Sequence, residues 1–529
     1  MREQDIQMSR TKTNNRNYVW GALILTVGSL ISKFLGIFFK IPLTNVMGDY
    51  GMGLYGYAYP LYVTFLTVST AGLPSAVSKM VSESVSSGNH RQAYRIFWTA
   101  FLTLFAMGLA SSLIMFFSAE WFIETFNWDP LAYKSIVAIS IAPFFVCLIS
   151  VVRGFFQGMQ MMVYTSVSEI LEQVGRVGVG VSLAIYWFNS RGVDWGAAGA
   201  TFGAVAGAII AFLFLYICFF IYKGRHRADV LEQPDDIEVK TRSEIFRTLI
   251  LIALPIALSS IVSNMMDLID SATIPGRLAV IGYAQKHITD LYGQLTSKSQ
   301  TLVNVPMVLG SALAVSLVPA ISESFAKKDM DKAVSKVTLA VKLTFLVSLP
   351  AALGLSLLSE PIIALLYPNS LTGFEILRWH SYTLIFSMAM LVLQGILQGA
   401  GRYYVPLINV IIGGVVKLVL NMILVSVPVL NIYGAIISTV AASFVIFMLN
   451  FTAVKRHIGF GKLARPLALI VLSTAVMGVV CYFSFGIISS FISPRIAVLI
   501  DIFISIVVYA GCILVTKAVT MDDLRSVRS

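Results

Sequence analysis

The feature that most constrains this chain is a succession of long apolar stretches with short polar breaks between them. A helix rises about 1.5 Å per residue, so about 20 apolar residues cross the roughly 30 Å hydrocarbon core of a bilayer. Hydrophobic residues make up 57% of the chain and charged residues 12%, and the mean hydropathy is +0.82, which excludes a soluble globular class. We predict an all-α polytopic membrane protein with about fourteen transmembrane helices. The predicted spans are residues 20–46, 54–86, 94–118, 131–157, 162–188, 195–222, 248–275, 288–325, 332–358, 372–399, 404–428, 432–455, 464–488 and 494–517.

The basic residues indicate on which side of the membrane the loops lie. The net charge is +11, and Lys and Arg gather in alternate loops, about 24 on the side of the N-terminus and about 6 on the other. This distribution indicates membrane orientation rather than a nucleic-acid partner. We therefore expect a multi-pass protein of the cell membrane in which both termini are cytoplasmic. The basic arm at 1–17 and the long charged loop at 223–247 would lie on the same side.

An internal repeat predicts the architecture. The sequence GFFQGMQ begins at Gly154 and the similar GILQGAG begins at Gly395. Ser-Glu-Ser triplets occur at 82–84 and again at 322–324. The two matches are offset by 241 and 240 positions, so the first twelve helices form two related lobes.

Each predicted lobe has six helices, an even number, so both lobes enter the membrane from the cytoplasm. The N-lobe covers 18–222 and the C-lobe covers 248–456, related as a pseudo-twofold parallel repeat about an axis along the membrane normal. Two extra C-terminal helices and a cytoplasmic tail occupy 457–529. Transporters of this build bind substrate between the lobes and work by rocking.

The first span carries two lysines inside its apolar sequence. Lys33 and Lys40 lie seven residues apart and share one helical face with Ser29 and Gly36. A charged side chain in the hydrocarbon region costs at least about 2.5 kcal/mol, so such residues usually face a protein interior or a water-filled cavity on a substrate path. The alternative is that the lysines extend toward the membrane interfaces.

Charged residues also fall inside later spans. Glu169, Glu172 and Arg176 lie at i, i+3 and i+7, and the last two are spaced for an i,i+4 ion pair. Lys417 occupies in the second lobe the place that Arg176 occupies in the first. These polar residues form either a neutralised structural cluster or part of a gate.

The seventh span has a similar polar face. Asp267 and Asp270, with Asn264 one turn earlier, form either a proton or sodium site or an interhelical ion pair. Arg277 and Lys298 frame the hairpin between the seventh and eighth helices. They either add positive charge to the cavity between the lobes or extend to the interface.

No motif indicates catalysis. The four cysteines sit singly in apolar segments, so we expect neither a disulfide nor a metal site. The chain has no nucleotide-binding loop, nucleophile elbow or HExxH sequence. We expect no enzyme activity and no cofactor. The membrane potential, Na⁺ and H⁺ all remain open as the source of coupling energy.

Five stretches of the chain resemble a known family. The chain resembles the polysaccharide-transport branch of the multidrug, oligosaccharidyl-lipid and polysaccharide (MOP) exporter superfamily, and within it the Gram-positive group containing stage V sporulation protein B and the lipid II flippase MurJ. The stretches are SLISKFLGIFFKIPLTN from Ser29, STAGLPSAVSKMVSES from Ser69, RGFFQGMQ from Arg153, SALAVSLVPAISESF from Ser311 and ILQGAGRYYVPLINVIIGGVVKLVLN from Ile396.

The resemblance implies roles for residues of the first helix. In the lipid II flippases a pattern like S-[RK]-x-L-G, followed by a further basic residue, faces the central cavity and holds the diphosphate. It maps onto Ser32, Lys33, Leu35, Gly36 and Lys40. This chain has lysines where the better-known relatives have arginines, and its second helix lacks their basic residue, reading LYVTFLTVS. Lysine serves as a point charge for phosphate rather than as a bidentate fork.

The expected function is therefore a flippase. It would move an undecaprenyl-pyrophosphate-linked sugar precursor from the inner to the outer leaflet by alternating access. The precursor that we expect first is peptidoglycan lipid II. Its partners would be the lipid-linked oligosaccharide, membrane lipids and wall-synthesis enzymes, and we expect a monomer. The alternatives are a cation-coupled multidrug exporter, a flippase for another lipid-linked polysaccharide or teichoic unit, and a membrane scaffold acting through residues 223–247.

Overall fold

The computed structural model describes the backbone of residues 2–70, 72–226 and 239–518. Side chains are described in these ranges except at 2–24, 26, 27, 30, 33, 37, 38, 255, 258, 259, 262 and 263. Most of the predicted cytoplasmic loop, the side chains of the basic arm and the end of the tail therefore lie outside the described part of the chain.

The chain divides into two compact units. The first unit comprises Met1–Phe39 and Tyr57–Leu268, and the second comprises Lys40–Gly56 and Ile269–Ser529. Helices α1 and α10 each contribute residues to both units. The lobe boundaries predicted from the sequence repeat stay a prediction.

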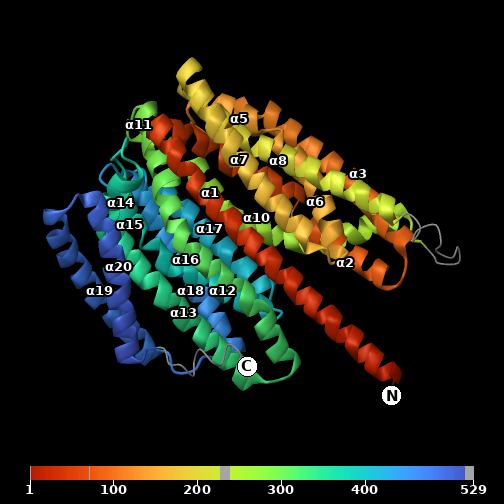
Figure 1. Ribbon diagram of the computed structural model, residues 1–529. Coiled ribbons are helices and arrows are strands. Elements are labelled where there is room, and N and C mark those ends of the chain that lie inside the picture. The colour runs from red at the N-terminus through yellow and green to blue at the C-terminus, as the bar shows by residue number, and fades with distance from the viewer. Residues whose placement is uncertain (1, 71, 227–238, 519–529) are drawn as a thin grey trace. The chain divides into compact units, whose positions relative to one another are not determined.

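The first unit is built from helices of the N-terminal half of the chain, coloured red to yellow-green in Figure 1. Its elements are α1 (Arg2–Thr70), α2 (Leu73–Ser86), α3 (His90–Phe117), α4 (Ala119–Phe126), the 3₁₀ turn η1 (Pro130–Ala132), α5 (Tyr133–Ile139), α6 (Ala142–Gly158), α7 (Met162–Arg191), α8 (Val193–Arg225) and the first part of α10 (Arg242–Val280).

The second unit contains the rest of α10, the middle of α1 and all later helices. These are α11 (Gln285–Gly293), the π-helical turn η2 (Gln294–Ser299), α12 (Gln300–Ala326), α13 (Met330–Leu357), α14 (Ser359–Leu366), α15 (Phe374–His380), α16 (Thr383–Gly399), α17 (Tyr404–Leu424), α18 (Asn431–His457), α19 (Ala464–Phe491) and α20 (Pro494–Thr516). Helices α19 and α20 pack against each other, and α19 also packs against α13 (Figure 1).

The prediction of an all-α membrane fold is confirmed. Every regular element in the described ranges is helical, and each predicted span falls on one helix or on consecutive helices. Ten helices among the described residues are long and apolar enough to cross a membrane, or eleven if the bent pair Phe374–His380 and Thr383–Gly399 forms one span. Phe34–Ser86 counts as a single candidate, although it includes parts of two predicted spans.

The predicted break between the first two spans, at residues 47–53, contains a kink. Two helices meet there within α1, and Gly48 between them has non-helical backbone angles, with φ of 68°. Such a backbone conformation carries little steric cost for glycine, so the chain kinks there and resumes its helix at once. Beyond the kink, a Cβ at Gly53 would lie 2.1 Å from the carbonyl oxygen of Thr289, so only glycine permits this approach to α11.

The sequence repeat has a structural counterpart at one glycine in each unit. A Cβ at Gly154 of α6 would lie 2.7 Å from the carbonyl oxygen of Pro74 in α2. A Cβ at Gly395 of α16 would lie 2.8 Å from the carbonyl oxygen of Ala314 in α12. The two contacts are offset by the same 240 to 241 positions as the sequence motifs. The repeated glycines therefore serve helix packing in both halves.

The turns before α3 and α13 repeat as well. Asn89 caps α3 by accepting a hydrogen bond from the backbone N–H of Gln92 at 2.9 Å. Asp329 caps α13 in the same way, accepting from the N–H of Lys332 at 3.1 Å. A carboxylate or amide oxygen in this position satisfies a backbone donor that the helix itself leaves unpaired. The repeat thus extends from sequence motifs to the hydrogen bonds of matching turns.

Helix α8 lies close against α7 through a row of small residues. A Cβ at Gly203 would lie 2.6 Å from the carbonyl oxygen of Arg176, and a Cβ at Gly207 would lie 2.2 Å from that of Glu172. Glycines spaced by four residues allow such close approach between membrane helices. The backbone of α8 therefore packs directly against α7 at Glu172 and Arg176, the two residues predicted to form an i,i+4 ion pair.

Candidate functional site

Helix α1 contacts α7 through small and polar residues in the first unit. The hydroxyl of Ser29 donates a hydrogen bond to Glu169 Oε2 at 2.6 Å. One residue earlier, a Cβ on Gly28 would lie 2.9 Å from the Cβ of Ser166. The face of the first span that the sequence marks as polar therefore meets a polar face of α7 at this level.

Further along the same pair of helices, polar atoms are buried without partners. The hydroxyl of Ser32 and the side-chain oxygen Oε1 of Gln173 make no hydrogen bond among the described residues. A Cβ at Gly36 would lie 3.5 Å from that oxygen of Gln173. The side chain of Lys33 lies outside the described residues, so its role in substrate binding stays a prediction.

The polar cluster predicted on α7 is present and joins two helices. Glu172 accepts hydrogen bonds from Arg176 at 3.2 Å and from Arg153 of α6 at 3.0 Å. Arg153 also donates to the hydroxyl of Ser168 at 2.9 Å. The predicted i,i+4 pair is confirmed, and one carboxylate connects the two guanidinium groups. This arrangement matches the structural alternative, in which the charges hold helices together.

Lys40 forms a hydrogen bond to the backbone of a neighbouring element. Its ammonium group donates a hydrogen bond to the carbonyl oxygen of Thr296 at 2.9 Å. Thr296 lies in the π-helical turn η2, and such turns occur frequently at functional sites. The half-buried side chain of Lys40 and the irregular backbone of η2 are therefore in direct contact in the second unit.

Lys298 is fully buried and forms an ion pair. Its side chain is 0% exposed and its Nζ atom lies 2.6 Å from Asp49 Oδ1. The ammonium group also donates to Ser370 at 2.8 Å and to the carbonyl oxygen of Thr372 at 2.9 Å. Because an ammonium group has three hydrogens, this set of partners occupies all of them. The proposed role of Lys298 in substrate binding stays a prediction.

The sequence predicts either an ion site or an ion pair at Asp270, and the structure contains the ion pair. Lys417 Nζ lies 2.7 Å from Asp270 Oδ2, and Asn421 donates to Asp270 Oδ1 at 2.9 Å. Asn421 also contacts Thr273 and Ser438. The basic residue thus pairs with a carboxylate in this half, as Arg176 does in the other.

The remaining predicted residues of α10 are spread along the helix. Asn264 donates a hydrogen bond to the hydroxyl of Thr67 at 2.8 Å. Asp267 is exposed and Arg277 is half-buried near the end of the helix. Their proposed roles in coupling and substrate binding stay predictions.

The sequence reasoning missed several charged residues that are buried or half-buried, among them Arg153, Asp49 and Asp501. Arg153 stands at the start of the repeated glycine motif, which could have directed attention to it. Asp49 follows the kink at Gly48 and pairs with Lys298. Asp501 is an acidic residue inside an apolar span and is 0% exposed. The last position was visible in the sequence, because intramembrane carboxyl groups are rare and usually functional.

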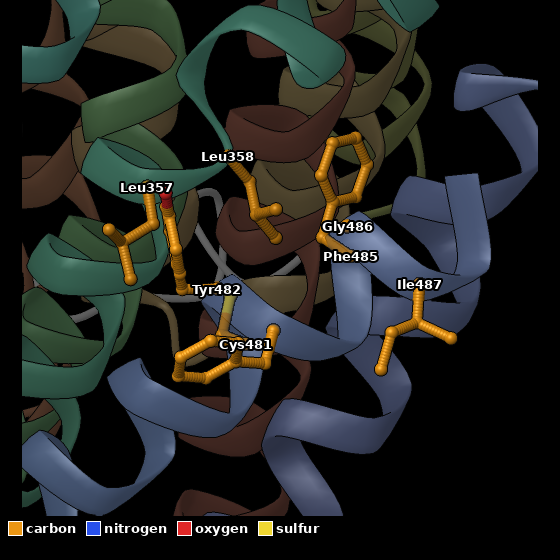
Figure 2. A pocket seen from close by; sticks show the side chains of 8 residues that line it. Leu357, Leu358, Cys481, Tyr482, Phe485, Gly486 and Ile487 are labelled. Carbon is orange, nitrogen blue, oxygen red and sulfur yellow. The ribbon is translucent and has the colours of Figure 1, made fainter. Parts of the chain in front are cut away.

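Among the described residues, no group of three or more His, Cys, Asp or Glu side chains could hold a metal ion. A cavity of about 420 Å³ lies in the second unit (Figure 2). It is lined by Leu357 and Leu358 at the end of α13 and by residues 481–483 and 485–487 of α19.

Comparisons with known proteins identify relatives along most of the chain. The model of the family described as "Polysaccharide biosynthesis protein" matches residues 19–325, and the MatE model matches residues 296–423. Lipid II flippase MurJ of Bacillus subtilis is 30% identical over 477 residues, covering 87% of each chain. Stage V sporulation protein B of the same organism is 27% identical over 517 residues, covering 97% of this chain and 98% of that protein.

Solved structures share the fold. A lipid II flippase MurJ in an inward closed conformation superposes with a TM-score of 0.68 at 18% identity, covering 95% of this chain and 99% of that one. An inward-facing multidrug resistance MATE transporter superposes with a TM-score of 0.63 at 15% identity, covering 82% of this chain and 98% of that one. At these identities the likeness concerns the fold alone.

Proposed function

Because the chain belongs to the polysaccharide biosynthesis protein family within the MOP exporter superfamily, we propose that it is a flippase for a lipid-linked saccharide precursor. The observation that carries this proposal is the 30% identity to a lipid II flippase over 87% of both chains. We propose lipid II as the substrate and transport from the inner to the outer leaflet by alternating access. The precursor consists of a polyprenyl tail, a diphosphate and a sugar.

The proposed anion-binding residues are the two lysines of α1. Lys40 already donates to a backbone carbonyl at 2.9 Å, which shows that its ammonium group is placed for hydrogen bonding inside the protein. An ammonium group is a compact charge with three donors, which suits the oxygens of a diphosphate. Lys33, seven residues earlier, would bind the same diphosphate. Ser32 would add a hydroxyl group as a hydrogen-bond donor. Gly36, which has no side chain, would leave space for the substrate on this face of the helix.

Orientation and energy source are also part of the proposal. The excess of Lys and Arg in alternate loops supports cytoplasmic termini. We propose transport without an organic cofactor, driven by the membrane potential or by a gradient of Na⁺ or H⁺. The carboxylate of Asp270 is engaged by Lys417 at 2.7 Å, so a cation would have to replace that ammonium group to bind there. The functional unit is proposed to be a monomer.

A second candidate function is drug export. The match of the MatE model to residues 296–423 and the shared fold with MATE transporters favour it. Such an exporter would bind amphiphilic cations, for which a pair of lysines in the first helix is unsuitable because like charges repel. Positive charges at Lys33 and Lys40 would therefore favour binding of an anionic lipid precursor and disfavour binding of a cationic drug.

The test measures outer-leaflet exposure of lipid II in cells whose only wall-precursor flippase is this protein. The variants are Lys33→Ala and Lys40→Gln, the latter keeping a hydrogen-bond donor for Thr296 while removing the charge. The matched control is Lys79→Ala, because Lys79 is 61% exposed and pairs with the neighbouring Glu83 on the same helix. Membrane abundance of each variant is measured in parallel.

We expect wild type and the control to expose lipid II and both lysine variants to lose exposure at normal abundance. Exposure that persists in both variants would overturn the diphosphate assignment. Absence of exposure in wild type, with the protein present, would exclude lipid II as the substrate. Resistance to amphiphilic cations in the same cells would then favour export of drugs.

A further inference from the structure

Two basic residues of the first unit lie against one tryptophan ring where three helices end. Trp195 is the third residue of α8, directly after the hairpin that joins α7 to α8. The Nζ atom of Lys134 in α5 lies 4.7 Å from the centroid of its ring. The guanidinium carbon of Arg191, the last residue of α7, lies 4.7 Å from the same centroid. Because a cation at this distance is attracted by the face of an aromatic ring, Trp195 holds both charges together.

The hairpin cluster, defined here as Lys134, Arg191, Asp194 and Trp195, carries an excess of one positive charge. Lys134 forms an ion pair with Asp194, and these two side chains are 38% and 15% exposed. Arg191 is exposed, and no Asp or Glu in the described part of the chain forms an ion pair with it. Its guanidinium group therefore has donors that an anion can reach from outside the protein.

The internal repeat shows that the fold does not require a cation at this place. Lys134 and Glu375 are 241 positions apart, the same offset as the repeated glycines, and α8 and α18 begin with the similar sequences WGA from Trp195 and YGA from Tyr433. In the second unit the hydroxyl of Tyr433 donates a hydrogen bond to Glu375 Oε2 at 2.9 Å. The corresponding positions therefore meet in both units, with a cation in the first and a carboxylate in the second.

The hairpin cluster lies at the level where membrane helices end. Pro130–Gly158 and Val193–Arg225 are both candidate spans, and Lys134 and Trp195 lie within the first five residues of these spans. The distribution of basic residues predicts that this end is extracellular. Tryptophan side chains concentrate at membrane interfaces, at the level of the lipid headgroups. A ligand at this level would therefore meet the cluster from the interface.

An exposed apolar residue lies deeper in the span, below Lys134. Ile141 follows Lys134 by seven residues, and the backbone angles of Ser140 and Ile141 are helical. Seven residues are nearly two turns, so Ile141 lies within about 20° of the face of Lys134 and about 10 Å deeper. Ile141 is 46% exposed, and Tyr133 beside Lys134 is 37% exposed. The surface thus combines positive charge at the helix end with apolar side chains further in.

We propose that the hairpin cluster binds the phosphodiester headgroup of an anionic phospholipid, with an acyl chain along Ile141. A guanidinium group binds phosphate oxygens through two parallel hydrogen bonds, and the ammonium group of Lys134 adds a point charge. A zwitterionic lipid also has a phosphate, but the excess positive charge would repel its choline cation. The site uses none of the residues proposed to bind lipid II, and it does not depend on the proposed flippase function.

The test measures lipid binding to the purified full-length protein by native mass spectrometry. Delipidated protein in detergent micelles is titrated with phosphatidylglycerol or with phosphatidylcholine of the same acyl chains. The variant is Arg191→Gln, which removes the exposed positive charge of the cluster. The matched control is Arg225→Gln, which removes an exposed arginine from the opposite end of α8.

We expect wild type to bind the first phosphatidylglycerol more tightly than the first phosphatidylcholine. Arg191→Gln should weaken binding of phosphatidylglycerol about tenfold, because it loses charged hydrogen bonds to the phosphate, and the control should bind like wild type. Equal affinities of wild type for the two lipids would overturn the proposal. Equal weakening in Arg191→Gln and in the control would also overturn it, because the attraction would then depend on overall charge.

A second variant keeps the test decisive if Arg191→Gln does not fold. Asp194→Asn removes the carboxylate that competes with a phosphate for Lys134. It should bind phosphatidylglycerol about two- to fivefold more tightly, the size of one partly exposed charge interaction, and a folding defect would not produce this gain. Unchanged or weaker binding in folded Asp194→Asn would contradict the proposed role of Lys134. Displacement of the lipid by inorganic phosphate at the same concentration would indicate a site for free anions instead.

Discussion

Replacing Lys298 with methionine should produce one of the largest losses of stability available in the second unit. The ammonium group is 0% exposed, and its partner Asp49 is 6% exposed. Methionine fills a similar volume but leaves the carboxylate buried, with the Thr372 hydroxyl as the only other hydrogen-bond donor found for it in the described residues. Removing one member of a buried ion pair costs about 3–5 kcal/mol, because the remaining charge is uncompensated.

The converse substitution should cost less. In Asp49→Asn the ammonium group of Lys298 keeps its hydrogen bonds to Ser370 and Thr372. The loss is then that of one charged hydrogen bond, about 1.5–3 kcal/mol. The double variant Asp49→Asn with Lys298→Met contains neither charge. It should be more stable than the sum of the single effects predicts, by about 1–3 kcal/mol.

The measurement is equilibrium unfolding of the purified protein in mixed micelles with increasing SDS, followed by tryptophan fluorescence. The control is Lys327→Met, because Lys327 is 70% exposed and its pair with Glu323 is accessible to water. Exposed pairs contribute little, so the control should unfold with wild type. Strictly additive effects of the two substitutions in the double variant would refute the ion pair as the source of stability.

Three further substitutions test other contacts. Gly154→Ala should destabilise the first unit by about 1–3 kcal/mol, because the added Cβ would lie 2.7 Å from a backbone oxygen. The control is Gly178→Ala, whose added Cβ has no described atom within 4 Å and should not destabilise the protein in the same unfolding assay. Glu172→Gln should lower thermal stability by removing the carboxylate that two arginines share, and equal melting curves would contradict this. Asp270→Asn should destabilise the protein, because it leaves the ammonium group of Lys417 buried without its carboxylate. The same change in a Lys417→Met background should cost much less stability, and equal costs in both backgrounds would disprove the ion pair.

Local sequence determined the helices, because a chain in hydrocarbon must satisfy its backbone hydrogen bonds within each span. Apolar runs of spanning length therefore predicted helices throughout the described ranges. The internal repeat was equally readable, since Gly154 and Gly395 serve the same close packing in both halves. The i,i+4 pair between Glu172 and Arg176 was predictable because helical geometry alone brings those residues together.

Only the tertiary structure decided which polar residues meet across helices. Lys298 and Asp49 are 249 positions apart, and Lys417 and Asp270 are 147 apart, so no local pattern connects them. Their pairing depends on how each helix is rotated and displaced against its neighbours. The same reason explains why the sequence left open what Lys298 faces. Hydropathy reports that a segment is buried in the membrane, but packing determines what each buried charge faces.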